Sequence, residues 1–461
     1  MTHSGPARPG DTSATIRLAV PIIAAYLADQ MLGFVDTLIA GRLGEAALAA
    51  VGIGNAIFTG ATILGIGLIT GLDPIVSQAV GAQRNADAVR ALASALVTAA
   101  ILAVPFALCV IVGSWASQGL GGLDAATGQG VVDYLGMRVY AVAPLYLQAA
   151  LGSFLQGHGN TKPLFISAVL VNCLNVPLSL ALSLGEKTGD LVGMSLPWLG
   201  EGSGVAGIGL ATSIVSAVRF GILAAFVWRY VPRHFVSQAS LTGARLLCRV
   251  GLPIGLHWLA EVGVFVVATL AVARFGTNQA AGHQIALQMA TLTFMFALGL
   301  GAATGVRVGQ AVGRRDTGGI WHAGKAGLQI VMLAMGLSAG ALAIFAESIA
   351  RLFTDSPAVI AAAVPLLRIA AIFQFADGVQ AVMAGAMRGA GDTRASFLLN
   401  ASGHWLVGVP SGLLLGFVFD GAARGLWWGL CIGLTLVAVG MTVRFYRRSR
   451  TGYEPVESTA T

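Results

Sequence analysis

The chain of 461 residues is 56% hydrophobic and only 10% charged, whereas soluble domains carry about 25% charged residues. This composition excludes a soluble globular protein, because no soluble fold of this length would bury so much apolar surface. The net charge of +7 does not indicate nucleic-acid binding, because the basic residues lie in short connections between apolar runs, where they set membrane orientation.

Residues 1–11 are polar and rich in Pro and Gly, and they lack the basic start and short apolar run of a cleaved signal peptide. Twelve apolar runs follow, each close to the roughly 20 residues that a membrane-spanning helix needs. Prolines within four of them predict kinks, at Pro21, Pro144, Pro253 and Pro410. The predicted spans are residues 16–40, 46–72, 89–113, 134–156, 163–185, 204–228, 246–273, 280–304, 322–346, 358–386, 395–419 and 422–445.

The connections after even-numbered spans are richer in arginine and lysine than those after odd-numbered spans. By the positive-inside rule this asymmetry places both termini in the cytoplasm of a multi-pass protein of the bacterial inner membrane. The basic residues after even-numbered spans include Arg84, Arg90, Lys162, Arg229, Arg233, Arg245, Arg307, Arg314, Arg315, Arg388 and Arg394, and the tail adds Arg447, Arg448 and Arg450.

The two halves of the chain match each other at one constant offset. Pro21-Ile22 matches Pro253-Ile254, Gln78-Ala79-Val80-Gly81 matches Gln310-Ala311-Val312-Gly313, and Gly157 matches Gly389. The repeat predicts an all-α membrane fold of two homologous six-helix lobes related by an axis along the membrane normal. Such a transporter architecture places its site near the midplane between the lobes. The predicted organisation is a tail at 1–15, an N-lobe at 16–228, a linker at 229–245, a C-lobe at 246–445 and a tail at 446–461.

Four acidic residues lie inside predicted spans, where a charged side chain costs roughly 2.5–3.5 kcal/mol on insertion scales. Asp29 and Asp36 share one face of the first span, because they are two helical turns apart. The repeat places Glu261 at the position of Asp29, and Asp377 lies within the tenth span. We expect all four to bind and release a coupling ion, H⁺ or Na⁺. The alternative role is a neutral carboxylic acid that is hydrogen-bonded between helices.

Other polar and aromatic side chains lie on the same predicted spans as these acids. The residues expected to support the acids are Asn172, Asn175, His257, Gln284, Gln374 and Gln380. Aromatic side chains predicted to line a substrate cavity, with core packing as the alternative, are Phe294, Phe296 and Phe375. Four further residues inside spans receive no role from the sequence, namely Arg138, Arg219, Arg368 and His404.

Sequence features of other functional classes are absent or misleading. Gly319 to Ala326 looks like a phosphate-binding loop, but it lacks the final Ser/Thr and follows no strand, so ATP is not expected. The four cysteines lie in apolar runs without metal-ligand spacing, which indicates packing residues. No nucleophile–base pair supports an intramembrane enzyme. We therefore expect no cofactor other than the coupling ion.

At several motifs the chain resembles the multidrug and toxic compound extrusion (MATE) family, especially its NorM-like bacterial branch. The stretches that carry the resemblance are Gly33-Phe34-Val35-Asp36-Thr37, Pro74-Ile75-Val76-Ser77-Gln78, Gly157 to Pro163 with Asn175-Val176-Pro177, Ala281-Gly282-His283-Gln284-Ile285-Ala286, and Asp377-Gly378-Val379-Gln380 with Arg388-Gly389. The resemblance implies a V-shaped, twelve-helix fold that exports organic cations in exchange for Na⁺ or H⁺. Its cation site in helices 7 and 10 falls on Glu261 and Asp377, which would be metal ligands if the ion is Na⁺. Its helix 1 aspartate falls on Asp36, and its helix 5 asparagine on Asn175.

Two departures from the family pattern favour H⁺ over Na⁺. Phe373 stands where the family has a hydroxylated residue one turn before the acid of helix 10, and Asp29 replaces a more usual neutral residue. The sequence therefore predicts a monomeric multidrug antiporter whose partners are lipophilic organic cations and the bilayer. The alternative is a flippase for a lipid-linked precursor of the same superfamily, which would favour a cationic cavity over the acidic one expected here.

Overall fold

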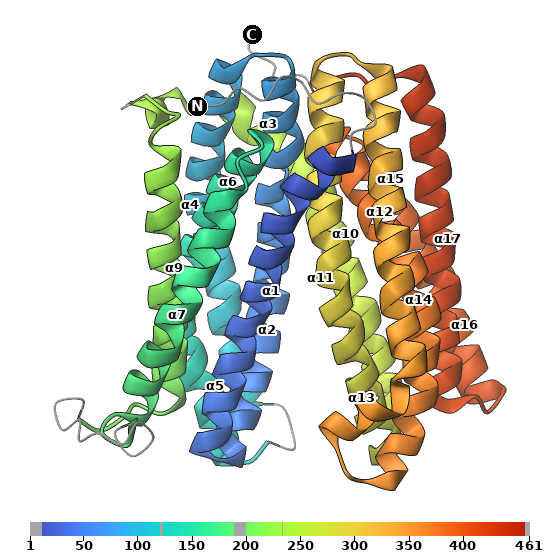
Figure 1. Ribbon diagram of the computed structural model, residues 1–461. Helices are drawn as coiled ribbons and strands as arrows, with labels where there is room; N and C mark the ends of the chain where they lie inside the picture. The colour runs from blue at the N-terminus through green and yellow to red at the C-terminus, as the bar shows by residue number, and fades with distance from the viewer. Residues whose placement is uncertain (1–11, 120–122, 189–199, 233, 457–461) are drawn as a thin grey trace.

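The computed structural model describes residues 12–119, 123–188, 200–232 and 234–456, which form helices joined by short connections (Figure 1). The first half forms a set of helices that we call the N-lobe, and the second half forms the C-lobe. The N-lobe contains α1 (Thr12–Leu43), α2 (Glu45–Thr70), α3 (Leu72–Gly81), α4 (Asn85–Gln118), α5 (Ala125–Arg138), η1 (Val139–Ala141), α6 (Val142–Gly157), α7 (Lys162–Leu184) and α9 (Val205–Val227). After η3 (Phe235–Gln238), the C-lobe contains α10 (Leu241–Ala273), α11 (Thr277–Gly313), α12 (Thr317–Ile344), α13 (Ala346–Phe353), α14 (Pro357–Gly389), α15 (Thr393–Ala401), η4 (Ser402–Gly408), α16 (Val409–Leu413), η5 (Leu414–Val418) and α17 (Ala422–Thr451).

Eleven helical segments among the described residues are long and apolar enough to cross a membrane. The predicted span 134–156 does not form one continuous helix, because the 3₁₀ turn η1 separates α5 from α6. Pro144 lies just after this turn, where its ring clashes with the carbonyl of the residue four before it and its nitrogen donates no hydrogen bond. The remaining predicted spans each fall on a long helical segment, so the all-α membrane fold is confirmed.

The predicted kink site at Pro410 lies between two π-helical segments. Pro410 stands in the short helix α16, with η4 before it and η5 after it. A π-helical turn lets the backbone pass a residue that cannot donate to the carbonyl four before it. His404 lies within η4, so this irregular backbone sets the direction of a buried histidine of the C-lobe.

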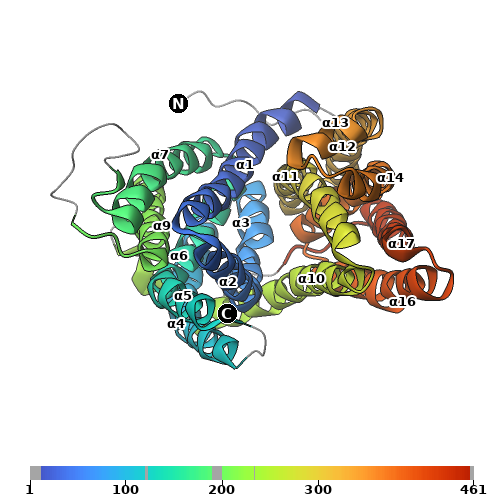
Figure 2. The ribbon, with the colours of Figure 1, turned by 90° about the horizontal axis from the view of Figure 1, so that it is seen from below.

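The two lobes meet at one end of the molecule and separate toward the other, giving a V shape (Figure 1). The end at which they meet is the end where α1 begins, α17 ends and α9 connects to α10. Seen from below, α1, α2 and α3 of the N-lobe face α10 and α11 of the C-lobe (Figure 2). The surface at which the lobes touch is called the inter-lobe seam below.

The repeated Gln-Ala-Val-Gly motifs face each other across the inter-lobe seam. Gln78 Nε2 donates to the carbonyl of Gly389 at 2.9 Å, and Gln310 Nε2 donates to the carbonyl of Gly157 at 3.0 Å. The two bonds are equivalent under the sequence repeat, because Gln78 corresponds to Gln310 and Gly157 to Gly389. A local two-fold axis therefore passes between the two motifs at the closed end of the molecule.

Glycines allow the helices of the seam to approach closely. A Cβ placed on Gly67 of α2 would lie 2.2 Å from the Cα of Gly255 in α10. One turn further on, a Cβ on Gly71 would lie 2.7 Å from the Cα of Gly251. In lipid, helix association depends on such close packing, because apolar burial between helices gives little driving force there.

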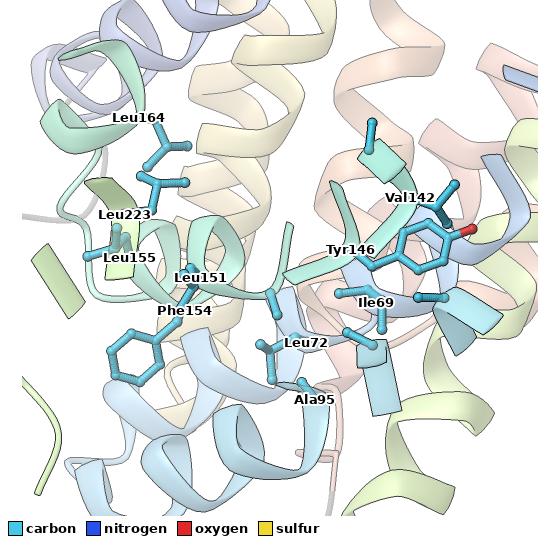
Figure 3. Packing of buried hydrophobic residues seen from close by; sticks show 14 of the residues in the cluster. Ile69, Leu72, Ala95, Val142, Tyr146, Leu151, Phe154, Leu155, Leu164 and Leu223 are labelled. Carbon is cyan, nitrogen blue, oxygen red and sulfur yellow. The ribbon is translucent and has the colours of Figure 1, made fainter. Parts of the chain in front are cut away.

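Large side chains packed against small ones hold the N-lobe together. Tyr146 of α6 is fully buried, and its hydroxyl donates to the carbonyl of Thr62 in α2 at 3.1 Å. Gly65 makes room for this ring, because a Cβ there would lie 2.2 Å from the tyrosine oxygen. Figure 3 shows Tyr146 beside Ile69 and Val142 within the same buried cluster. This packing fixes α2 and α6 relative to each other beside the seam.

Candidate functional site

A cavity of about 340 Å³ lies within the C-lobe, between α10, α11 and α14. Glu261 and Asp377 both line it, and the remaining lining side chains are apolar except for two threonines. The full lining is Glu261, Val262, Phe265, Val266, Thr269, Leu270, Leu287, Ala290, Thr291, Phe294, Phe373 and Asp377. The structure thus brings together two acids that are far apart in the sequence, in a pocket whose lining contains no lysine or arginine.

Burial and helix position define how the two acids are presented. Asp377 is 5% exposed in the middle of α14, and the Glu261 side chain is 13% exposed in α10. Charged groups in such surroundings need a partner, because isolated charges are costly to bury. Around Asp377 the described lining supplies only the second acid, Glu261, and neutral residues. A cation in this cavity would therefore meet two carboxyl groups that no lysine or arginine of the lining neutralises.

Three aromatic rings shape the wall of the C-lobe cavity. Phe294 lines it, as expected, together with Phe265 and Phe373. The rings of Phe265 and Phe373 meet edge to face, with centroids 6.2 Å apart. The other two expected aromatics are not part of this lining. Phe296 is 42% exposed on α11, and Phe375 is 36% exposed on α14. Residues two positions apart on a helix point in different directions, which is why Phe294 and Phe296 separate.

Asp36 lies in a second, tightly hydrogen-bonded site in the N-lobe. It is 3% exposed, and it accepts bonds from Asn175 Nδ2 at 3.1 Å and from Thr212 Oγ1 at 2.8 Å. The positive charge of Arg138 also acts on this carboxylate, and its guanidinium lies 4.7 Å from the ring centroid of Phe58. The expected contact between Asn175 and the helix 1 acid is therefore present.

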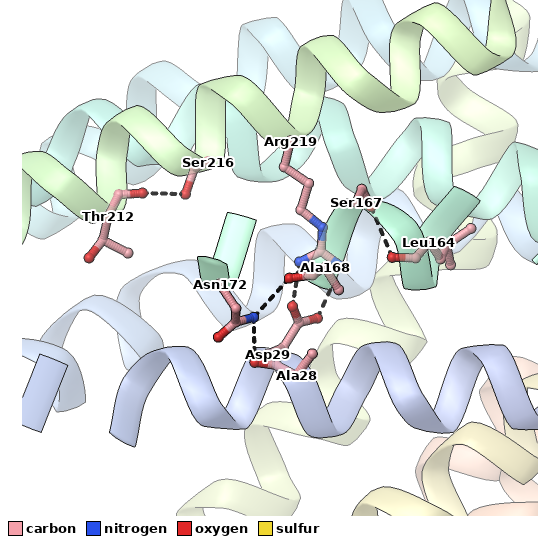
Figure 4. A network of polar contacts seen from close by, with 9 residues as sticks. All are labelled: Ala28, Asp29, Leu164, Ser167, Ala168, Asn172, Thr212, Ser216 and Arg219. Carbon is pink, nitrogen blue, oxygen red and sulfur yellow. Dashed lines mark hydrogen bonds and ion pairs between the residues drawn. The ribbon is translucent and has the colours of Figure 1, made fainter. Parts of the chain in front are cut away.

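Asp29 forms an ion pair with Arg219 of α9 (Figure 4). Arg219 Nη1 and Nη2 donate to the two carboxylate oxygens at 2.5 and 3.2 Å, which is the bidentate geometry of strong arginine–carboxylate pairs. Asn172, which was expected to support an acid, instead donates to the carbonyls of Ala28 and Ala168, both at 2.9 Å. Asp29 is thus the most fully compensated of the four candidate acids.

We expect loss of one partner of the Asp29–Arg219 pair to destabilise the N-lobe more than loss of both. Asp29→Asn leaves Arg219 without its carboxylate, and Arg219→Gln leaves Asp29 unpaired, at a cost of about 1.5–3 kcal/mol for hydrogen bonds to charged groups. The double variant leaves no isolated charge and should recover part of this loss. Thermal unfolding of the four purified proteins in one detergent measures the effect. Equal losses for single and double variants would contradict the pairing.

A further cavity of about 240 Å³ lies beside the inter-lobe seam, with residues of both lobes in its lining. Its charged residues are the Asp29–Arg219 pair and a second pair between the lobes, in which Asp73 Oδ2 lies 3.9 Å from Arg388 Nη1. The guanidinium of Arg388 also stacks 5.7 Å from the ring centroid of Trp258. Acids and arginines balance in this cavity, in contrast to the purely acidic cavity of the C-lobe.

The other candidate residues are dispersed. Gln284 is exposed on α11, and Arg368 is exposed on α14. Gln374 is fully buried, and neither atom of its amide has a hydrogen-bond partner among the described residues. Gln380 contacts His257, one turn before Glu261. Within the described part of the chain there is no group of three or more His, Cys, Asp or Glu side chains that could hold a metal ion.

Sequence reasoning did not find the partners of the N-lobe acids. Arg138 and Arg219 stood out as charges within spans, but only the packing of α9 against α7 and α1, and of α5 against α9 and α2, shows which acid each one serves. Thr212 gave no signal at all, because threonine is common in membrane helices and usually bonds within its own helix. It does so here too, since its hydroxyl also lies 3.0 Å from the carbonyl of Ile208.

Both the sequence and the fold of this chain are similar to those of known proteins. A family model described as MatE matches residues 21–181 and 253–414, one stretch in each half of the chain. "Probable multidrug resistance protein NorM" of Xylella fastidiosa (strain 9a5c) is 35% identical over 440 residues, which cover 94% of this chain and 91% of that protein. "Multidrug resistance protein NorM" of Vibrio vulnificus (strain YJ016) is 32% identical over 446 residues, covering 95% of each. A solved outward-facing conformation of a multidrug resistance MATE family transporter has a TM-score of 0.83 at 22% identity and covers 98% of both chains.

Proposed function

This chain belongs to the MatE family, and on that premise we propose that it exports organic cations in exchange for H⁺ or Na⁺. Transport of drugs across a membrane, without enzymatic chemistry, follows from the NorM relatives and from the fold. The observation that carries the more detailed proposal is the pairing of Glu261 and Asp377 in an apolar cavity whose lining holds no basic residue. No cofactor is required beyond the coupling ion.

The chemistry of the C-lobe cavity suits a lipophilic cation. Phe265, Phe294 and Phe373 supply apolar and aromatic surface, and aromatic faces attract cations. Glu261 and Asp377 supply negative charge, and in a site of low dielectric that charge attracts a cation more strongly than it does in water. An H⁺ or Na⁺ that binds the same carboxyl groups removes this attraction. Competition between ion and substrate for one pair of acids is the physical basis of the proposed exchange.

The N-lobe acids are assigned different parts in the exchange. Asp36 accepts bonds from Asn175 and Thr212, so uptake of a proton there would weaken both contacts and loosen α1 from α7 and α9. Asp29 already has Arg219 as its cation, so we propose that it contributes least to ion coupling. The coupling ion accordingly acts first on Glu261 and Asp377, where no arginine competes with it.

We favour H⁺ as the coupling ion. A bound Na⁺ needs several oxygen ligands, whereas a proton needs one carboxylate. The C-lobe cavity offers the oxygens of Glu261, Asp377, Thr269 and Thr291, and the aromatic ring of Phe373 takes the wall position one turn before Asp377. That ring supplies no ligand where a hydroxyl would complete a metal site.

The proposed orientation places both termini and the closed end of the V in the cytoplasm of a bacterial inner membrane. The arginine-rich connections lie at that end, where the positive-inside rule expects them. The C-lobe cavity is lined by residues from the half of α10 nearer to the open end. The structure then presents its acidic cavity to the outside, from where the coupling ion enters. We propose that one chain forms one transport unit, because each lobe contains its own acids.

Dye efflux under separately imposed gradients tests the proposal. Purified protein in liposomes loaded with ethidium is given an inward H⁺ gradient, an inward Na⁺ gradient or neither. We expect efflux with the H⁺ gradient and none without a gradient. Efflux with only the Na⁺ gradient would replace H⁺ by Na⁺, and no efflux under either gradient would contradict cation export. In that case a lipid-linked precursor becomes the substrate to test.

A further inference from the structure

A cluster of neutral polar side chains surrounds His257 on the inner side of Glu261. His257 is 5% exposed, and its Nε2 lies 3.5 Å from Glu261 Oε2. The same Nε2 lies 3.2 Å from Gln380 Nε2 and 3.2 Å from Asn400 Nδ2, and Nδ1 lies 3.5 Å from Ser396 Oγ. Helices α10, α14 and α15 thus converge on one imidazole that the C-lobe cavity does not itself expose.

In each of the two amides around His257, only the nitrogen has a hydrogen-bond partner among the described residues. Gln380 Oε1 and Asn400 Oδ1 are buried and have no hydrogen-bond partner among the described residues. A buried acceptor left unpaired costs about 1–3 kcal/mol, so such atoms call for a physical reason. An amide that turns by 180° exchanges its nitrogen for its oxygen while it occupies the same space. The unused oxygens are therefore available to the ring when the amides turn.

The two amide orientations match the two protonation states of the ring. With the amide nitrogens toward Nε2, as in the structure, Gln380 and Asn400 donate to the lone pair of a neutral imidazole. With its oxygen toward Nε2, either amide accepts from the N–H of an imidazolium, and Glu261 is a further acceptor for the same N–H. Rotation of the amides therefore allows the same two residues to serve either protonation state of the ring.

We propose that His257 is a second proton-binding residue of the C-lobe site, sharing one proton with Glu261. The proton leaves the carboxylic acid at Glu261 Oε2 and binds His257 Nε2, which gives a carboxylate beside an imidazolium, and the reverse step restores the neutral pair. Whichever residue holds the proton, the net charge of the pair is zero. This inference rests on the proposed exchange of H⁺ for organic cations.

The consequence is that the proton does not have to stay on the carboxyl group that attracts the substrate. A proton held on His257 lies behind Glu261, outside the lining of the cavity that the substrate enters. The imidazolium still cancels the charge of Glu261, so the attraction for an organic cation falls. A change in external pH therefore changes the protonation of His257 and, with it, the affinity of the cavity for substrate.

Several charged or titratable groups act on this pair. Among the described residues, Glu261 comes from α10 itself, Asp377 and Arg388 from α14, and His404 from η4. Helix α15 contributes the neutral Ser396 and Asn400, and α2 approaches through glycine backbone at Gly67. Arg388 lines a small cavity with His257 and is paired with Asp73. The acid in direct contact with the ring is Glu261.

A matched control exists in the same lobe. His283 of α11 is 1% exposed, and its ring contacts Trp427 Nε1 at 3.1 Å and Thr269 Oγ1 at 3.0 Å. Among the described residues, no carboxylate is hydrogen-bonded or ion-paired to His283. Its neutral partners satisfy both ring nitrogens. A His283→Gln variant therefore removes a buried imidazole of similar exposure without touching the proposed proton pair.

The test is the pH dependence of ethidium binding to purified protein in detergent, followed by fluorescence polarisation from pH 5 to 9. For His257→Gln we expect the pH midpoint of binding to move by about one unit or more, the usual size of an interaction between adjacent charges. Asn400→Leu removes an amide of the cage while keeping the imidazole, and it should move the midpoint in the same assay. Wild type and His283→Gln should share one midpoint.

The outcomes separate this inference from the proposed function. If wild type binds no ethidium at any pH, the export of organic cations is contradicted. If wild type binds it and both His257→Gln and Asn400→Leu keep the wild-type midpoint, His257 holds no proton and the inference is overturned. Weaker binding with an unchanged midpoint also overturns it, because that is the result of a packing role. If His257→Gln does not fold, the midpoint of Asn400→Leu decides.

Discussion

Glu261→Gln and Asp377→Asn are each expected to abolish gradient-driven ethidium export. Each replacement keeps the shape of the side chain but removes a negative charge from the C-lobe cavity, whose lining holds no basic residue to compensate. At an effective dielectric constant of about 20, a carboxylate 4 Å from a cation contributes on the order of 4 kcal/mol. Even a third of that energy corresponds to about a tenfold loss of affinity. Efflux from liposomes and ethidium binding in detergent measure the two consequences.

The control for the acid variants is Glu347→Gln. Glu347 lies in α13, where it pairs with Arg351 at 2.6 Å and its side chain is 61% exposed. It is a C-lobe acid outside the cavity, so export should stay at the wild-type rate. If Glu261→Gln or Asp377→Asn exported at the same rate as Glu347→Gln, the assignment of these carboxyl groups to ion coupling would be contradicted.

Gly67→Ala is expected to weaken closure of the inter-lobe seam. In an isolated helix this change would stabilise α2 by about 1 kcal/mol, because alanine has the higher helix propensity. At the seam the added Cβ would lie 2.2 Å from the Cα of Gly255, so α2 and α10 must move apart. Overpacking costs about 1–3 kcal/mol, which corresponds to roughly a 5- to 150-fold shift between closed and open states. Weaker closure of the seam would therefore show that tertiary packing outweighs helix propensity, and stronger closure would show the reverse.

Labelling of a reporter cysteine measures the opening of the seam. Thr70 lines the cavity beside the seam and is 9% exposed, so Thr70→Cys should react slowly with a membrane-impermeant maleimide while the seam is closed. The four native cysteines are replaced by alanine beforehand. Gly60→Ala in the same helix is the control, since nothing lies within 4 Å of a Cβ there. Equal labelling rates in the Gly67→Ala and Gly60→Ala proteins would contradict the close approach.

Much of the helical architecture follows from local sequence, because lipid requires every spanning segment to satisfy its own backbone hydrogen bonds. The predicted spans 163–185 and 204–228 agree with α7 and α9 to within one residue at each end. Agreement is poorer where backbone geometry depends on neighbours. The break at η1 and the π-helical turns around Pro410 are responses to a proline that the surrounding helices stabilise. The short helix α13 was not predicted, because it is only eight residues long and contains charged residues, so it does not form an apolar run.

By itself the sequence determined most of the spans, the repeat of the two halves and the four acids within those spans. Only the tertiary structure decided that Gln78 and Gln310 each donate a hydrogen bond to a glycine carbonyl of the opposite lobe. It also decided that Asp29 has an arginine in direct contact while Glu261 has a histidine. The reason is physical. Apolarity and helical period are properties of neighbouring residues, whereas the partner of a buried polar group depends on how distant helices are rotated and packed against one another.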